Sequence, residues 1–120
     1  MPQTVKLALH DVPHPEALAR LMQRAATELA REFPAILGCR LSAERLAAFD
    51  GKGHGFEIHL ELLFPQHQIV LNRAGATPKA ALDAALGAAR REIERVASRD
   101  PAVALYPRAK KEAEPLPAAA

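Results

Sequence analysis

The sequence predicts an α+β fold, a two-layer sandwich in which a four-stranded mixed sheet has two helices on one face. Three observations predict it. Four short segments alternate apolar with polar residues, two longer segments repeat apolar residues at helical spacing, and the segments follow the order β-α-β-β-β-α. A strand joined through a helix to a parallel strand, followed by hairpins, places both helices on the same side of such a sheet.

The first two predicted elements are a strand and a helix. Val5, Leu7 and Leu9 alternate with other residues, which is typical of a strand with one buried face. Prolines at positions 13 and 15 end this strand and begin a helix, because proline is well tolerated in the first helical turn. The helix should continue to about Phe33, just before the next proline.

Three strands and a second helix are predicted in the rest of the domain. The expected strands cover residues 39–44, 56–63 and 68–72, with a short turn at residues 65–67 between the last two. They should form an antiparallel meander. Thr77 followed by Pro78 is a strong signal for a helix N-cap and first turn, and an amphipathic helix is expected after it.

The chain of 120 residues is long enough for one domain with its own core, which we place at residues 1–99. Residues 100–120 contain four prolines and a terminal alanine run, and their composition predicts a flexible Pro/Ala-rich tail. No apolar segment approaches the roughly 20 residues of a membrane span, and no signal segment is evident. We therefore expect a soluble cytoplasmic protein with no membrane partner.

The single cysteine, Cys39, excludes an intramolecular disulfide framework and any site with several thiolate ligands. Its place in the strand pattern puts Cys39 on the buried face, where a thiol is an inert small hydrophobe. A reducing compartment is consistent with this composition.

The formal net charge is only +2, which disfavours a diffuse polycation that binds nucleic acid nonspecifically. Residues 1–75 contain 8 basic and 8 acidic side chains, whereas residues 76–99 contain 5 and 3. The surplus positive charge therefore lies on the second predicted helix.

The basic residues of both helices are candidates for contacts with nucleic acid. On the second helix, Arg91 and Arg95 point away from the apolar stripe, and Lys79 and Arg90 flank it. On the first helix, three arginines fall in a band about 40° wide opposite its stripe. These three are Arg20, Arg24 and Arg31.

The alternative for these charges is an ordinary solvated helix surface. In that case Arg90 pairs with Glu94 and Arg95 pairs with Glu92, each pair contributing a few tenths of a kcal/mol. The sequence alone favours this interpretation for the helix charges.

The helix-free face of the sheet should contain polar and charged residues from several strands and no row of aromatic side chains. These residues are Lys6, Arg40, Ser42, Glu44, Glu57, His59 and Glu61. Base stacking is therefore disfavoured, and any nucleic-acid contact should be to the backbone. Glu57, His59 and Glu61 share one strand face, but a metal or catalytic site would need further ligands, so an ordinary polar face is expected.

The glycines at positions 51, 53 and 55 match no phosphate-binding motif and predict a mobile hairpin loop. No nucleophile and base form a readable motif either. We expect a protein that is not an enzyme and that has no cofactor, no metal and no small-molecule substrate.

Six short segments in a characteristic order and spacing are similar to a known family. They are residues 14–18, 39–41, 55–60, 69–73, 84–86 and 88–91. Over about residues 3–99 the chain resembles the short form of the ribosome hibernation promoting factor and ribosome-associated inhibitor family, also called the sigma-54 modulation family. The family's β-α-β-β-β-α fold agrees with the architecture predicted from periodicity.

The resemblance implies a factor that occupies the mRNA and tRNA channel of the small ribosomal subunit, contacts its rRNA and blocks translation under stress or in stationary phase. The residues implied by matching position are Arg40, Arg73, Arg90 and Arg91. Physical reasoning adds Lys79, Arg95, Arg20 and Arg24. Their role would be to pair with phosphates, which arginine does with a planar bidentate fork.

A second hypothesis is a diverged protein of the same fold that binds another protein or RNA partner. Many relatives have basic and histidine residues between the second and third strands, whereas residues 46–50 here are Leu-Ala-Ala-Phe-Asp. The neutral balance of residues 1–75 also favours this alternative. Because the chain lacks the second folded domain of long family members, we expect no direct role in ribosome dimerisation.

Overall fold

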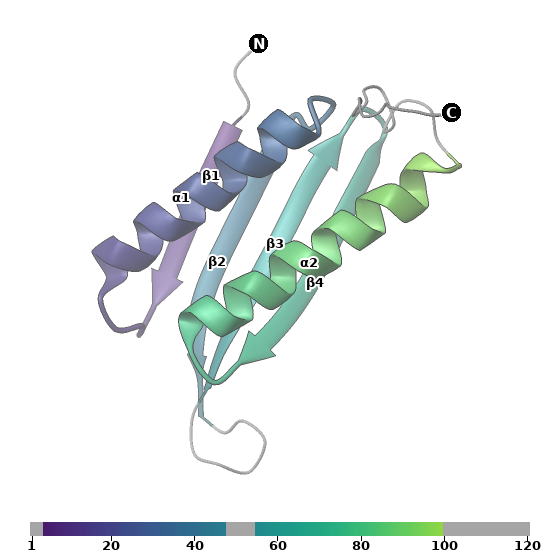
Figure 1. Ribbon diagram of the computed structural model, residues 1–120. Coiled ribbons are helices and arrows are strands. Elements are labelled where there is room, and N and C mark those ends of the chain that lie inside the picture. The colour runs from purple at the N-terminus through teal and green to yellow at the C-terminus, as the bar shows by residue number, and fades with distance from the viewer. Residues whose placement is uncertain (1–3, 48–54, 100–120) are drawn as a thin grey trace.

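A computed structural model describes residues 4–47 and 55–99, and its element order is β-α-β-β-β-α (Figure 1). The elements are β1 (Thr4–His10), α1 (Pro15–Glu32), β2 (Gly38–Leu46), β3 (Gly55–Phe64), β4 (His67–Gly75) and α2 (Pro78–Ala97). The expected tail at 100–120 and most of the glycine-containing loop lie outside the described residues.

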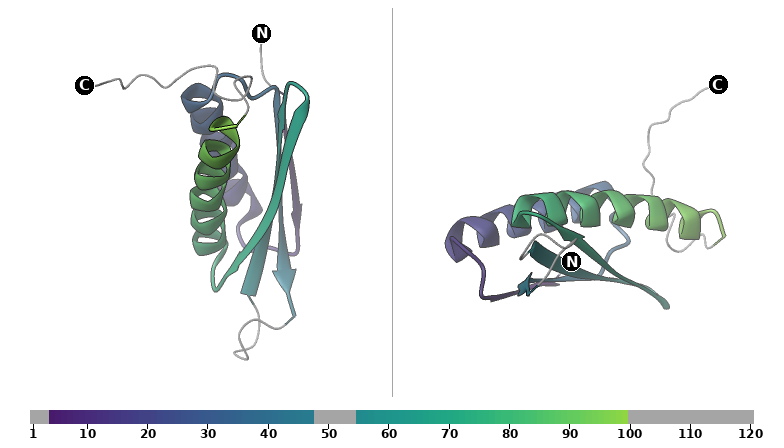
Figure 2. Two further views of the ribbon diagram at one scale, coloured as in Figure 1. Left: turned by 90° about the vertical axis from the view of Figure 1, so that its right-hand side faces the viewer. Right: turned by 90° about the horizontal axis from the view of Figure 1, so that it is seen from below.

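The four strands form one mixed sheet in the order β1-β2-β3-β4. β1 is parallel to β2, while β2, β3 and β4 pair antiparallel as a meander. Both helices cover the same face, and the edge-on views of Figure 2 show the other face without a second layer. The predicted two-layer α+β sandwich is confirmed.

The core lies between the sheet and the helices. On the sheet side, Leu41, Ile58 and Leu60 are fully buried at the centre of β2 and β3. On the helix side, Met22 of α1 and Ile93 of α2 are buried against them. Burial of each such side chain contributes roughly 1.5–3 kcal/mol, which makes this layer the main source of stability.

Two local features fix the start of α2 on the sheet. The Thr77 hydroxyl accepts a hydrogen bond from the N–H of Ala80 at 3.0 Å, which confirms the predicted N-cap. Gly75, at the end of β4, approaches the helix so closely that a Cβ there would stand 2.7 Å from the backbone nitrogen of Ala81. Only a glycine allows this spacing between β4 and α2.

The turn between β3 and β4 differs from the prediction of a three-residue turn. His67 already pairs with Phe64, so the turn contains only Pro65 and Gln66, with Gln66 in the left-handed region at φ 61°. β4 also continues past residue 72 to Gly75. Residues 72–74 are exposed and break the apolar alternation, although their backbone pairing with β3 continues.

Cys39 is buried, as predicted from the strand pattern. Removal of the thiol from water raises the pKa of Cys39 to about 11, so the group stays protonated and unreactive near neutral pH. Neither of the two described helices is long and apolar enough to cross a membrane.

Candidate nucleic-acid interface

The basic residues singled out from the sequence lie on two different surfaces. We call the solvent-facing side of α1 and α2 the helix surface. We call the helix-free side of the sheet the open face; its central rows are Lys6, Arg40, Glu61 and Val70, and Ala8, Ser42, His59 and Asn72. Arg40 therefore lies on the opposite side of the domain from Arg20, Arg24 and Arg91.

α1 presents three exposed arginines on the side opposite its buried stripe. The stripe includes Leu18, Met22 and Leu29, and it is held against the sheet. Arg20, Arg24 and Arg31 are exposed, and no described residue forms an ion pair or hydrogen bond with their side chains. Their guanidinium groups are available to an external anion.

Arg91 is the corresponding residue on α2. It is exposed, and its Nη1 atom lies over Gly87, 3.6 Å from where a Cβ of that residue would stand. Within residues 4–47 and 55–99 it has no carboxylate partner. Its position agrees with the expectation that Arg91 points away from the apolar stripe.

Arg90 joins the two helices instead of pairing within α2. Its Nε donates to Oε1 of Glu32 at 2.9 Å, so the expected pair with Glu94 is wrong. The physical reason is that the last turn of α1 docks beside α2 and brings a carboxylate from a distant part of the chain. Arg31 and Arg91, the sequence neighbours of this pair, are both exposed.

The other two basic residues predicted on α2 pair with carboxylates of their own helix. Arg95 donates two hydrogen bonds to Glu92, one of them at 3.1 Å, which confirms the expected pair. These bonds lower the pKa of Glu92. Lys79 lies 2.9 Å from Asp83. All of these groups are at least partly exposed, so salt screens the pairs and a phosphate can replace either carboxylate.

Arg73 lies near the end of β4 that leads into α2. It pairs across the ladder with the buried Ile58, which puts its side chain on the helix side of the sheet at the exposed edge. Its Nη1 donates to the backbone oxygen of Asn72 at 2.7 Å. Arg73 thus belongs to the same side of the domain as the helix surface.

A chain of polar contacts crosses the open face. Arg40 lies 3.3 Å from Oε1 of Glu61, whose Oε2 is 3.0 Å from Nε2 of His59; the other ring nitrogen is 2.6 Å from Oδ1 of Asn72. The hydrogen bond with Glu61, followed by the bond with Asn72, raises the pKa of His59. These contacts partly neutralise the positive charge of Arg40.

The open face also contains Glu44 and Glu57, opposite each other on β2 and β3. No aromatic side chain of the described strands lies on it, because Phe56 and Phe64 are both buried on the helix side. In the part of the chain that the structure describes, no three His, Cys, Asp or Glu side chains gather to hold a metal ion. Glu57, His59 and Glu61 share this face without forming such a group.

One feature of this surface could not be recognised from the sequence. The Glu32–Arg90 contact joins residues 58 positions apart, and no local pattern signals it. Arg31, which belongs to the predicted basic band of α1, is exposed like Arg20 and Arg24.

Comparison with known proteins gives a match only among solved structures. No protein-family model and no curated protein matches the chain. The crystal structure of the N-terminal domain of Protein Y from Thermus thermophilus is similar, with a TM-score of 0.62 and 15% sequence identity. The match covers 79% of this chain and 99% of that chain. At this identity the likeness establishes a shared fold.

Proposed function

We propose that the protein is a non-enzymatic, cytoplasmic factor of the ribosome hibernation family that binds the small ribosomal subunit through its helix surface. The observation that supports this most directly is a set of exposed arginines on that surface that have no carboxylate partner within residues 4–47 and 55–99. They are Arg20, Arg24, Arg31 and Arg91. The sequence resemblance and the fold shared with the Protein Y domain favour the same function.

The helix surface is suited to an RNA backbone because its cations are spread over two helices of fixed spacing. The Glu32–Arg90 contact helps to hold α1 beside α2, so the exposed arginines form a shaped array. Guanidinium groups bind phosphate oxygens in a bidentate manner, and each contact releases condensed counterions from the RNA. Binding should therefore depend steeply on salt and little on base sequence.

Paired cations would make a second group of contacts. Lys79, Arg90 and Arg95 each contact a carboxylate that is partly or fully exposed, so each can exchange this partner for a phosphate at low cost. Arg73 lies on the same side of the domain. Arg40 lies on the open face and is not part of this binding surface, so we expect it to contribute little to the affinity for the subunit. In this proposal translation is blocked by occupancy of the mRNA and tRNA channel under stress or in stationary phase.

Co-sedimentation with purified small ribosomal subunits tests the proposal. The wild-type protein should move with the subunits at low salt and be released as the salt concentration rises. The double variant Arg24→Ala/Arg91→Ala should bind more weakly and with a salt slope reduced by about two, since each lost phosphate contact removes roughly one unit. A wild-type protein that stays in the free fraction at low salt would contradict ribosome binding.

A matched control separates the helix surface from the open face. The variant Lys6→Ala/Arg40→Ala removes the same charge from the other side of the sheet. It should bind the subunits almost as well as the wild type. If it loses binding while the helix variant keeps it, the contact surface is the open face instead.

A further inference from the structure

Large exposed apolar side chains gather at one end of the open face. Leu37, Leu63 and Val70 have exposed fractions of 50%, 47% and 52%. The N–H of Leu37 donates to the carbonyl of Leu63 at 2.7 Å, and Val70 lies on β4 opposite Glu61, beside Leu63. Such clustering on a soluble domain is typical of an interaction surface rather than of scattered exposure.

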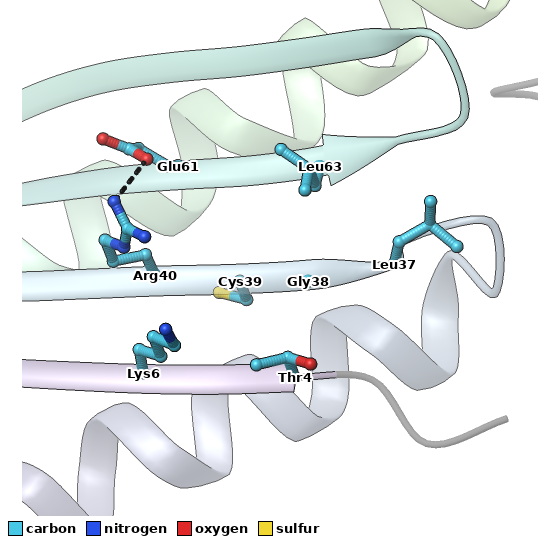
Figure 3. Close-up of a pocket in the computed structure, with 8 residues that line it drawn as sticks. All are labelled: Thr4, Lys6, Leu37, Gly38, Cys39, Arg40, Glu61 and Leu63. Atoms are coloured by element: carbon cyan, nitrogen blue, oxygen red, sulfur yellow. Dashed lines mark hydrogen bonds and ion pairs between the residues drawn. The ribbon is translucent and has the colours of Figure 1, made fainter.

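A groove of about 240 Å³ lies between β1 and two of these side chains, Leu37 and Leu63 (Figure 3). Its floor is at Gly38, which stands between Thr4 on β1 and Leu63 on β3 and has no side chain to fill the gap. Leu37 closes one end. Since a cavity of about 150 Å³ holds a benzene molecule, this groove has room for one leucine-sized side chain.

The next row of the sheet places charge beside the groove. Lys6 has no partner among the described residues, and Arg40 uses its Nη1 for Glu61 while its other N–H groups are not engaged. Two cations and one carboxylate leave a positive balance that suits one carboxylate ligand. A phosphate chain is disfavoured, because Glu44 and Glu57 occupy the same face further along the strands.

We propose that this groove binds a short acidic segment of a partner protein. An aliphatic side chain of the segment lies over Gly38 between Thr4 and Leu63, and a neighbouring carboxylate pairs with Lys6 and Arg40. The apolar contact supplies affinity, and the ion pair sets the orientation of the segment. The site is on the opposite side of the sheet from the helix surface, so it does not depend on ribosome binding.

The probe for this site is the blocked dipeptide acetyl-Leu-Glu-amide, titrated into the ¹⁵N-labelled full chain and followed by amide NMR shifts. Saturable shifts are expected at residues 4–6, 37–40 and 61–63, with half-saturation in the millimolar range. Acetyl-Leu-Gln-amide lacks the carboxylate that would pair with Lys6 and Arg40. Acetyl-Ala-Glu-amide lacks the aliphatic side chain that would lie over Gly38. Both should bind more weakly, by about fivefold or more.

The variant Gly38→Val places a side chain at the floor of the groove, and thermal melts check that it folds. A Cβ at Gly38 would stand 3.5 Å from the Thr4 carbonyl oxygen and 3.9 Å from the Leu63 Cβ, which are ordinary contacts. It should raise the half-saturation concentration at least about tenfold. Ala8→Val, on the same face two residues beyond Lys6, is the matched control and should leave binding unchanged.

Three results would overturn the proposal. The first is the absence of saturable shifts at the solubility limit of the dipeptide. The second is equal binding of the wild type and the Gly38→Val variant while thermal melts show both folded. The third is a 12-nucleotide oligouridylate that shifts the same amides at lower concentration than the dipeptide, which would identify the groove as part of a nucleic-acid surface.

Discussion

The helix surface and the open face both contain arginine, but the arginines are in different electrostatic states. Arg24 and Arg91 on the helix surface have no carboxylate partner in the part of the chain that the structure describes. Arg40 on the open face is paired with Glu61, which also contacts His59. An unpaired surface cation attracts an external anion at full strength, whereas a paired one must first exchange its partner.

For ligand recognition, whether a cation is paired with a carboxylate matters more than the number of charges on each side of the sheet. The net charge of +2 gives no indication that four arginines without a carboxylate partner among the described residues share the helix surface. The open face combines cations with glutamates and exposed leucines, a composition that suits a protein segment better than a polyanion. The two surfaces are therefore expected to recognise different chemistry.

The largest expected effect is a loss of stability when the close contact between β4 and α2 is disturbed. In Gly75→Ala the new Cβ would stand 2.7 Å from the Ala81 nitrogen, so α2 must shift on the sheet. We expect a loss of about 3 kcal/mol in the free energy of unfolding, measured by urea denaturation. The control is Gly87→Ala, whose Cβ would meet only the Arg91 side chain at 3.6 Å. It should increase stability by about 0.5–1 kcal/mol, because alanine is the better helix former.

The next effect concerns affinity for the ribosome. Arg24→Ala/Arg91→Ala should weaken binding to small subunits at least about tenfold, since charge-assisted hydrogen bonds to phosphate are lost. Co-sedimentation at several salt concentrations measures the change. Lys6→Ala/Arg40→Ala, with the same change in net charge, should change the affinity for small subunits by less than about twofold. Equal losses in both variants would mean that the two surfaces do not differ as proposed.

A smaller effect should follow from releasing Arg90. Glu32→Gln removes the carboxylate charge that holds Arg90, at a cost below about 1 kcal/mol because both side chains are partly exposed. Affinity for small subunits should rise about twofold to fivefold. Glu28→Gln removes the same charge from an exposed position of α1 and should give a smaller gain. An identical gain in both variants would show that only net charge matters.

The smallest expected effect is the pH dependence of the open face. Because the folded pKa of His59 is raised, its contribution to stability is fully present below its unfolded pKa of about 6.5 and is lost as the pH rises through the folded value. Glu61→Gln should lower the pKa of His59, measured by NMR titration of the imidazole. Glu57 affects His59 by its charge and not by a hydrogen bond, so Glu57→Gln should lower the pKa of His59 less. An unchanged pKa in Glu61→Gln would contradict the hydrogen-bonded chain.

Much of the fold could be predicted because its signals are local. The apolar alternation of 56–63 and the Thr77–Pro78 capping signal define β3 and the start of α2 without any tertiary information. The end of β4 could not be placed in this way. Arg73 and Ala74 are exposed at the sheet edge, so backbone pairing alone keeps them in the strand.

The candidate site was predicted less completely. Periodicity placed Arg20, Arg24 and Arg91 away from the apolar stripes of their helices, and the structure agrees. The strand alternation also placed Arg40 on the helix-free face, and the structure agrees. It could not show that Arg40 lies beside Glu61, because the strand pattern gives the alternation of faces but not the neighbours across the sheet. The groove at Gly38 was missed for the same reason.

The sequence by itself determined the identity and order of the six elements, the buried stripe of each helix and the location of the surplus charge. These properties depend on residues within a few positions of one another. Only the tertiary structure decided which arginines are neutralised and where an apolar groove opens. Arg90 meets Glu32 and Gly38 meets Leu63 because whole elements dock side by side, and that docking depends on the packing of the entire core.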